Sequence, residues 1–216
     1  MTASGKNIIS PYSLGEEIAN SITHGIGALL SVAGLVFLII LSVQRGSIWH
    51  IVSFSIFGLA LIFMYLASTL YHSIPSKKAK KIFKIIDHSA IYVLIAGTYT
   101  PFLLISLRGT LGWVLFAVIW SLAIAGIIFK SFFIGKYSKA SVAVYVLMGW
   151  LCIFAGKELF NALPLNGLLL LALGGLFYTF GVIFYAWKKL PYGHSIWHLF
   201  VLCGSVAHYF SIILYV

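Results

Sequence analysis

Long apolar runs separated by short polar connections dominate this chain of 216 residues. Each run is about 17–25 residues long, the length that an α-helix rising about 1.5 Å per residue needs to cross a hydrocarbon layer of about 30 Å. A membrane β-barrel would instead show strands of about ten residues with alternating apolar and polar positions. The pattern predicts an all-α bundle of seven transmembrane helices, over residues of about 22–43, 48–72, 85–107, 111–129, 140–156, 165–187 and 195–216.

Composition agrees with a membrane location. Hydrophobic residues make up 62% of the chain, charged residues only 8%, and the mean hydropathy is +1.07. A water-soluble core of this size requires no such excess. We therefore interpret residues 1–216 as a single integral membrane domain with an N-terminal tail of about residues 1–20, in which we expect no secretory signal peptide. The motif Ser13-Leu-Gly-Glu16 has the form of a capping box, which places the start of the first helix near Leu14.

Basic residues are distributed unevenly between the two sides that this topology creates. Eleven of the 14 fall on one side, at Lys6, Lys77, Lys78, Lys80, Lys81, Lys84, Lys130, Lys136, Lys139, Lys188 and Lys189, and three on the other, at Arg45, Arg108 and Lys157. Because short loops rich in Lys and Arg stay in the cytoplasm, the bias predicts a cytoplasmic N-terminus and an extracellular C-terminus. The net charge of +10 is then mainly a topology signal that also favours anionic headgroups. We expect membrane lipids rather than nucleic acid as partners, and the sequence leaves the oligomeric state open.

Four residues that can bind metal ions fall at helix ends on the predicted cytoplasmic side. His72 ends the second helix, Asp87 lies near the start of the third, and His194 and His198 share one face of the seventh because they are four residues apart. Neutral imidazole is a favoured zinc ligand, and three protein ligands with an open fourth position are typical of a catalytic zinc. We predict a zinc ion bound by the three histidines.

Asp87 and Ser68 complete the predicted site. Asp87 is either a fourth ligand or the group that holds a zinc-bound water, whose pKa the metal would lower towards about 7. Ser68, one turn before His72, either hydrogen-bonds the substrate or bonds back to the preceding helical turn. A competing interpretation is that each of these residues is simply interfacial, with a side chain that reaches water. The presence of an acid beside three histidines, in a chain with only four acids, favours the metal site.

Other polar residues show weaker patterns. Glu17, Asn20 and His24 share a face of the first helix, where they either clasp helix ends around the site or merely cap and anchor the helix. His208 lies about 15 Å beyond the predicted ligands of the last helix, so we expect it to form a structural hydrogen bond with a neighbouring helix. Pro101 lacks an N–H group and should bend the third helix.

Several strings resemble the signatures of the progestin and adiponectin receptor (PAQR) family. They are Glu17-Ile-Ala-Asn20-Ser-Ile-Thr23-His24, Ser68-Thr-Leu-Tyr-His72, Asp87-His-Ser-Ala-Ile-Tyr with Gly97-Thr-Tyr-Thr-Pro101, and His194-Ser-Ile-Trp-His198. The chain is identified as a member of the bacterial branch, hemolysin III, from about residue 16 onwards. The resemblance implies seven helices in a bacterial plasma membrane and an internal N-terminus. It also implies a zinc near the cytoplasmic face, bound by His72, His194 and His198, with Asp87 holding a water.

Three functions are consistent with these observations. The first is a zinc-dependent hydrolase of a lipid amide or ester, in which Asp87 accepts a proton and Ser68 orients the substrate; the adiponectin receptors that the chain resembles are reported to hydrolyse ceramide. The second is a pore-forming cytolysin, which the branch name suggests, although the helices lack a charged stripe that could line a pore. The third is a membrane sensor or receptor in which zinc clamps the second and seventh helices together.

Overall fold

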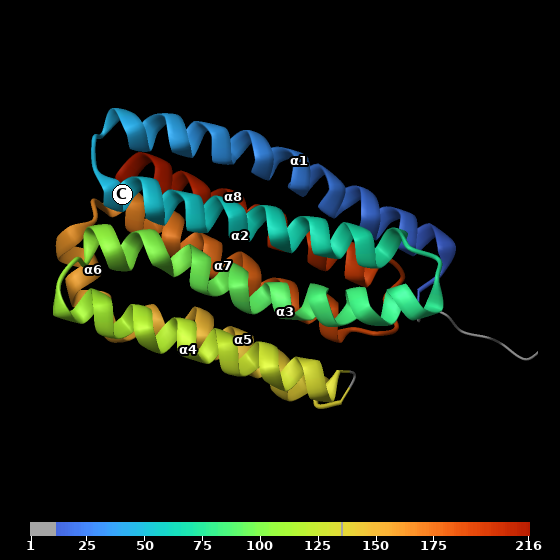
Figure 1. The fold of residues 1–216 in the computed structure, drawn as a ribbon. Helices are drawn as coiled ribbons and strands as arrows, with labels where there is room; N and C mark the ends of the chain where they lie inside the picture. Colours follow the sequence, from blue (N-terminus) through green and yellow to red (C-terminus); the bar gives the residue numbers. More distant parts are fainter. Residues whose placement is uncertain (1–11, 135) are drawn as a thin grey trace, which may run out of the picture.

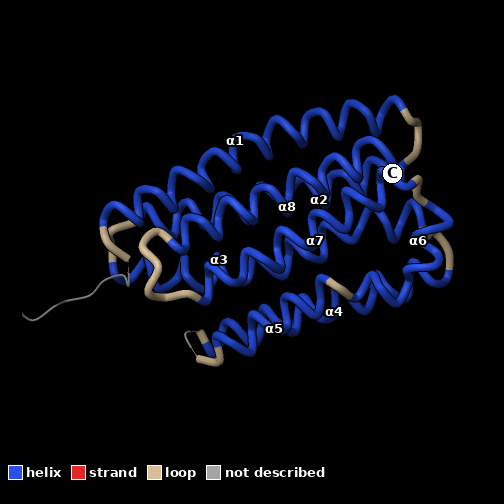
Figure 2. The backbone as a smooth tube through the Cα atoms, turned by 180° about the vertical axis from the view of Figure 1, so that it is seen from behind, coloured by secondary structure: helices blue, strands red, loops and turns tan. Residues whose placement is uncertain are grey.

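The computed structural model describes residues 12–134 and 136–216, which form helices connected by short loops, with no strand in these two ranges (Figures 1 and 2). The α-helices are α1 (Leu14–Gln44), α2 (Ile48–Ser73), α3 (Lys77–Pro101), α4 (Thr110–Phe133), α5 (Ser138–Gly149), α6 (Gly156–Ala162), α7 (Leu165–Ala186) and α8 (Gly193–Tyr215). A π-helix (Phe102–Ser106) extends α3, and a 3₁₀-helix (Leu151–Ala155) connects α5 to α6.

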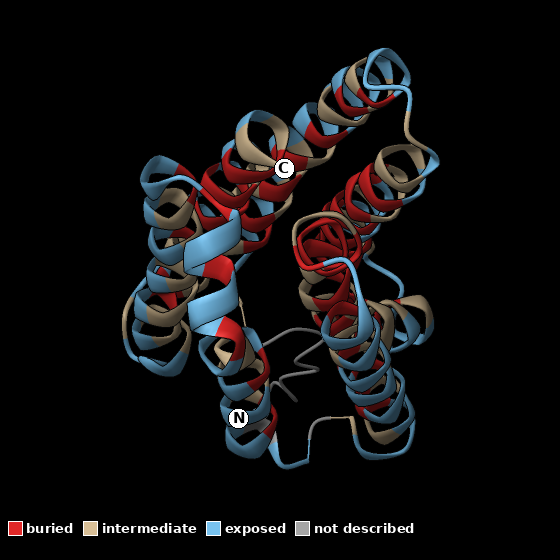
Figure 3. Cartoon of the chain, turned by 90° about the vertical axis from the view of Figure 1, so that its left-hand side faces the viewer, coloured by how far each residue is buried: buried red, intermediate tan, exposed pale blue. Residues whose placement is uncertain are grey.

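These elements make seven segments that are long and apolar enough to cross a membrane. The π-helix completes the third segment, and α5, the 3₁₀-helix and α6 together make the fifth. Large apolar side chains cover the outward faces, for example Leu29, Phe132 and Phe154, which are 75%, 77% and 82% exposed. Buried positions lie on the inward faces (Figure 3). Because only lipid can solvate such a surface, the predicted all-α bundle of seven membrane helices is confirmed.

Two helices begin earlier than their apolar runs, because polar caps extend them. The Ser13 hydroxyl accepts a hydrogen bond from the Glu16 N–H, and the Glu16 carboxylate accepts one from the Ser13 N–H. The predicted capping box is therefore present, and α1 begins at Leu14 as that motif predicts, ahead of its apolar run. Ser76 caps α3, which therefore begins at Lys77 rather than at 85. The lysines at 77–84 thus form the first turns of a helix instead of a loop.

One end of the bundle, on the right in Figure 1, contains the start of α1 and three connections. These connections join α2 to α3, α4 to α5 and α7 to α8. The described lysines of this end are Lys77, Lys78, Lys80, Lys81, Lys84, Lys130, Lys136, Lys139, Lys188 and Lys189. We call it the basic end. Arg45, Arg108 and Lys157 lie towards the opposite end. The gathering of lysines is a property of the fold, whereas the side of the membrane that the basic end faces stays a prediction.

Pro101 changes the type of helix rather than ending it. It is the last residue of α3, and the chain continues as a π-helix in which the Leu107 N–H donates to the carbonyl of Phe102 at 2.8 Å. Because proline removes one donor from the α-helical ladder, a π-helical turn is a natural continuation. The bend that the sequence predicts at Pro101 stays a prediction, whereas the change to a π-helix directly after it was not predicted.

Close packing of α1 against α2 brings the polar face of α1 to the metal centre described below. A side chain on Gly27 would collide with the ring of Tyr65, so only glycine permits this approach. The Tyr65 hydroxyl is itself fixed, since it donates to the Ser205 hydroxyl at 2.7 Å. The first two helices and α8 are thus held in one register next to the site.

Candidate metal centre

Three histidines meet inside the bundle at the basic end. His72 lies in the last turn of α2, and His194 and His198 lie in the first turns of α8. One nitrogen from each ring can be chosen so that all three lie within 4.8 Å of one another. His72 and His198 are only 3% and 2% exposed, so they are buried groups rather than interfacial side chains that reach water. The structure therefore brings together the three residues that the sequence predicts as ligands, and they are close enough to hold a metal ion.

The polar atoms of this group fit a metal ion. Nε2 of His72 and Nδ1 of His194 are buried and have no hydrogen-bond partner within the described ranges. A buried polar atom left without a partner costs about 1–3 kcal/mol. Unpartnered nitrogens on two of three histidines that lie this close together are the arrangement expected for ligands of an ion. The geometry does not identify the metal.

A buried carboxylate orients His72. The Nδ1–H group of His72 donates to Oε2 of Glu17 at 2.6 Å, and the other carboxylate oxygen of Glu17 lies 2.7 Å from Nζ of Lys80. A hydrogen bond at Nδ1 fixes the tautomer and leaves the Nε2 lone pair free for a metal. Helices α1 and α3 therefore jointly position a residue of α2.

Backbone and side chains of α1 also orient His198. Its Nδ1–H group donates to the carbonyl of Asn20 at 3.2 Å, and the Asn20 side chain accepts a hydrogen bond of 2.6 Å from the Ser195 hydroxyl. The ring of His24 stacks on that of His198, with centroids 3.5 Å apart and planes inclined by 10°. Of the two interpretations of the polar face of α1, the structure supports the first, because Glu17, Asn20 and His24 clasp α2 and α8 around the site.

Asp87 and Ser68 lie on the wall of a cavity that His194 and His198 also line. Asp87 is 7% exposed, and its Oδ2 is 3.5 Å from Nδ1 of His88. It does not belong to the three-histidine group. The Ser68 hydroxyl is buried and has no hydrogen-bond partner in the described parts of the chain, so the alternative of a bond back to the preceding turn is not observed. The catalytic roles predicted for these two residues stay predictions.

Tyr12 covers the metal centre and was not found from the sequence. Its ring stacks on His194 with centroids 4.8 Å apart, and its centroid lies 5.7 Å from that of His72. Burial raises the pKa of the Tyr12 phenol well above its ordinary value. Tyr12 precedes α1 and belongs to no helical repeat, so no spacing signal could have identified it.

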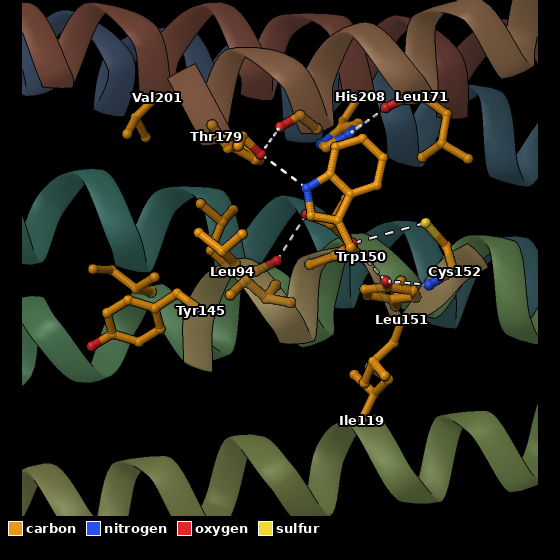
Figure 4. A pocket seen from close by; sticks show the side chains of 18 of the residues that line it. Leu94, Ile119, Tyr145, Trp150, Leu151, Cys152, Leu171, Thr179, Val201 and His208 are labelled. Carbon is orange, nitrogen blue, oxygen red and sulfur yellow. Dashed lines mark hydrogen bonds between the residues drawn. The ribbon is translucent and has the colours of Figure 1, made fainter. Parts of the chain in front are cut away.

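The cavity has a volume of about 590 Å³ and extends from His194 and His198 to His208. Figure 4 shows the part of it around Trp150 and His208. Its lining is largely apolar, with scattered polar groups such as Thr179, whose hydroxyl accepts a hydrogen bond of 2.9 Å from the Trp150 indole. His208 donates through Nε2 to the carbonyl of Leu171 on α7 at 3.1 Å. The structural hydrogen bond expected for His208 is therefore confirmed.

Comparison with known proteins agrees with the motifs and with this geometry. A family profile described as haemolysin-III related matches residues 12–209. The chain belongs to the haemolysin-III-related family. It is 57% identical over 204 residues to a hemolysin-3 homolog of Bacillus subtilis, covering 94% of this chain and 96% of that protein. It is 55% identical over 201 residues to hemolysin-3 of Bacillus cereus, covering 93% and 92% of the two chains.

A human relative extends the similarity beyond bacteria. Monocyte to macrophage differentiation factor of Homo sapiens is 31% identical over 203 residues, covering 91% of this chain and 83% of that protein. Together with the seven apolar helices, the relatives establish this haemolysin-III-related chain as a multi-pass membrane protein. The two Bacillus relatives indicate the bacterial plasma membrane as its location.

We expect Glu17→Gln to weaken metal binding by the haemolysin-III-related protein about tenfold while the fold is retained. The neutral amide is a poorer acceptor for the Nδ1–H group of His72, and groups that orient metal ligands typically contribute about 10–100-fold to affinity. The measurement is a metal titration of both proteins against a competing chelator. The matched control is Glu16→Gln, which removes the neighbouring negative charge. Within the described residues, the Glu16 carboxylate accepts hydrogen bonds from the N–H groups of Ser13 and Tyr192 and does not contact the histidine group. Equal loss of affinity in both variants would contradict the assigned role.

Proposed function

We propose that this membrane protein hydrolyses an amide or ester bond of a lipid and uses zinc to do so. The observation that carries the proposal is that two members of the histidine group, His194 and His198, line a large apolar cavity whose wall also contains Asp87 and Ser68. Ligand cavities of about 300–1,000 Å³ with few polar groups are typical of sites for small apolar molecules. A metal group at the wall of such a cavity is consistent with chemistry on a lipid.

Zinc suits the donor set, because three imidazoles with an open fourth position are typical of catalytic zinc sites. When bound, zinc would supply Lewis acidity, which polarises a carbonyl group and makes a water molecule nucleophilic near neutral pH. His72, His194 and His198 would hold it. The Glu17 carboxylate would keep His72 in the required tautomer, as it does in the structure.

Asp87 is the proposed general base. Its carboxylate lies on the cavity wall, where it can accept a proton from the attacking water and return it to the leaving amine or alcohol. Ser68 has a buried hydroxyl whose hydrogen-bonding capacity is unused within the described residues, so it can bind a polar group of the substrate. The apolar remainder of the cavity can take an acyl chain and exclude bulk water from the reacting bond.

The proposal extends to the orientation of the protein. We propose that the basic end faces the cytoplasm, as the excess of lysine there predicts. The histidines lie in the terminal turns of α2 and α8, and therefore at the depth where the headgroups and ester linkages of the inner leaflet meet the hydrocarbon layer. A lipid could then present its scissile bond to the site without leaving the membrane.

The test is fatty-acid release by purified protein from a panel of ceramides and phospholipids. We expect the zinc-loaded wild type to release fatty acid from at least one lipid, chelated protein to release none, and Asp87→Ala to match the chelated protein although it keeps its zinc. Release by the wild type that does not exceed that of Asp87→Ala over the whole panel would refute the proposal.

One observation favours a second candidate, a receptor or sensor with a structural metal. The histidines join α2 to α8, and a metal between them would clamp the two helices together. In that case metal removal lowers the melting temperature but no lipid is turned over. The largely apolar cavity gives no support to a water-filled pore, which is what a cytolysin of the kind suggested by the branch name would require.

A further inference from the structure

The lysines of the basic end fall into two groups with different surroundings. One group is either exposed or already paired: Lys77, Lys78, Lys81, Lys136, Lys139 and Lys189 lie at the surface, and Lys80 binds Glu17. The other consists of half-buried Lys84 on α3, buried Lys130 on α4 and Lys188 in the α7–α8 connection, which is exposed but lies over the ring of Tyr185. We call it the lysine cluster. Only the second group calls for an explanation beyond membrane topology.

Lys130 is a buried cation without an anionic partner. Its side chain is only 2% exposed, and it makes no hydrogen bond or ion pair with any described residue. Its Nζ lies over the ring of Tyr145, 6.0 Å from the ring centre. A charged ammonium is expensive to bury unless something compensates for it. The sequence interpretation of Lys130 as a loop charge that only sets topology is therefore incomplete.

Lys84 lies beside the ring that Lys130 faces. The Lys84 carbonyl accepts a hydrogen bond of 2.8 Å from Nδ1 of His88, and the His88 carbonyl accepts one of 2.9 Å from the Tyr145 hydroxyl. The ammonium of Lys84 repels those of Lys130 and Lys188. Partial burial, together with this repulsion from Lys84, lowers the pKa of Lys188. The Lys188 ammonium also stands 4.0 Å from the ring centre of Tyr185. Three cations from three segments thus converge on one small region.

No acidic residue neutralises this region. The chain has four acids, namely Glu16 in the cap of α1, Glu17 beside the metal centre, Asp87 against His88, and Glu158 in α6 towards the opposite end. None forms an ion pair with a member of the lysine cluster within the described ranges. Asp87, three residues after Lys84 on α3, is the acid whose charge reaches Tyr145 and Tyr185. A single carboxylate cannot balance three ammonium groups, and this excess of positive charge makes the cluster a site for an anion from outside the chain.

The lysine cluster adjoins the cavity and the metal centre. Lys130 lies over the ring of Tyr145, and Lys188 over that of Tyr185. Both rings line the cavity, and Figure 4 shows Tyr145 on its wall. The Tyr185 ring is 5.7 Å from that of His194, and the charge of Lys188 acts on the same histidine. An anion held by the cluster would therefore lie beside the metal centre, at the basic end of the cavity.

We infer that the lysine cluster binds the phosphate of a lipid headgroup, so that the lipids taken by this site are phosphate-bearing acyl lipids rather than neutral ceramides or diacylglycerols. In glycerophospholipids and in phosphorylated sphingolipids the phosphate and an acyl linkage lie only a few bonds apart on one backbone. A phosphate at the cluster thus leaves the acyl linkage near His194 and the acyl chain in the cavity. That such a lipid is also the substrate rests on the proposed function, whereas its binding does not.

The test compares two lipids that differ only in the phosphate. Full-length protein in detergent is titrated with dioleoyl phosphatidic acid and with dioleoylglycerol, and bound lipid is measured by native mass spectrometry. We expect the wild type to bind the phosphatidic acid at least about tenfold more tightly. Lys130→Met should remove most of this difference without changing the affinity for dioleoylglycerol, and Lys130→Arg should restore it.

Lys189→Met is the matched control, because it removes the same charge from the exposed neighbour of Lys188 and should leave both affinities unchanged. Equal affinity of the wild type for the two lipids, or equal effects of Lys130→Met and Lys189→Met, would overturn the inference. Inorganic phosphate is titrated in parallel, and binding that is as tight as that of phosphatidic acid would assign the cluster to free phosphate instead. Metal content reports whether each variant folds, and the double variant Lys84→Met/Lys188→Met replaces Lys130→Met if that protein is unstable.

The measurement separates this inference from the proposed function, because it records binding and not turnover. Phosphate-dependent binding without fatty-acid release would leave a lipid-binding site and remove the hydrolase. Release of fatty acid from ceramide or diacylglycerol, with no preference for phosphate in binding, would support the hydrolase and refute the phosphate site.

Discussion

Replacing His198 by alanine is expected to abolish metal binding, the largest effect of any single substitution in this protein. His198 is buried, supplies one nitrogen of the three-histidine group and is held by the Asn20 carbonyl. Metal-binding free energies of about 10–16 kcal/mol are shared among four ligands in structural zinc sites, so one lost ligand removes roughly 3 kcal/mol, or more than about a hundredfold in affinity. The measurement is metal content per chain after purification without chelators, for example by plasma mass spectrometry.

His208→Ala provides the control, because His208 lies on the same helix, is equally buried and binds a neighbouring helix rather than the metal centre. We expect this variant to lose stability, since the Leu171 carbonyl loses its donor and a cavity forms, but to keep its metal. Added metal should raise the melting temperature of wild type and of His208→Ala, and not that of His198→Ala. A full equivalent of metal bound to His198→Ala would show that the histidine group is not the site.

The second large effect concerns Asp87. If Asp87 acts as the general base, Asp87→Asn should lower the rate of lipid hydrolysis by about 10²–10⁴-fold. Because Asp87 lies outside the three-histidine group, metal content should not change. Both quantities are measured on the same preparation, with Glu158→Gln, an acid towards the opposite end of the bundle, as the control for lost charge.

The result also separates the two roles that the sequence leaves open for Asp87. Loss of metal together with activity would identify Asp87 as a fourth ligand rather than a base. Unchanged activity in Asp87→Asn would exclude both roles.

The helices were predictable from the sequence because the membrane imposes their length, and a run of apolar residues records that length directly. The start of α1 was predictable from its capping box, whereas that of α3 was not, because Ser76 extends α3 with polar turns outside the apolar run. The histidine group was predictable because His194 and His198 lie four residues apart and loop charges place His72 on the same side. In each case a short-range pattern carried the information.

The surroundings of the site depend on the register between helices that are distant in sequence, and no local pattern encodes that register. Glu17 meets His72 across 55 residues, and His24 stacks on His198 only because α1 lies against α8 at one particular height. Tyr12 lies outside any helix. Lys130 has the same sequence pattern as its exposed neighbours, and only the packed structure distinguishes a buried cation from a surface one.

The contacts of Glu17 and Asn20 have a consequence for biosynthesis. These residues emerge from the ribosome with α1, whereas His194 and His198 are made only when α8 is translated. A nascent chain that stops before α8 therefore contains Glu17 and His72 but cannot complete the histidine group. Any metal that the histidine group holds can be acquired only after the seventh segment joins the first two, so bound metal would mark a chain whose membrane insertion is finished.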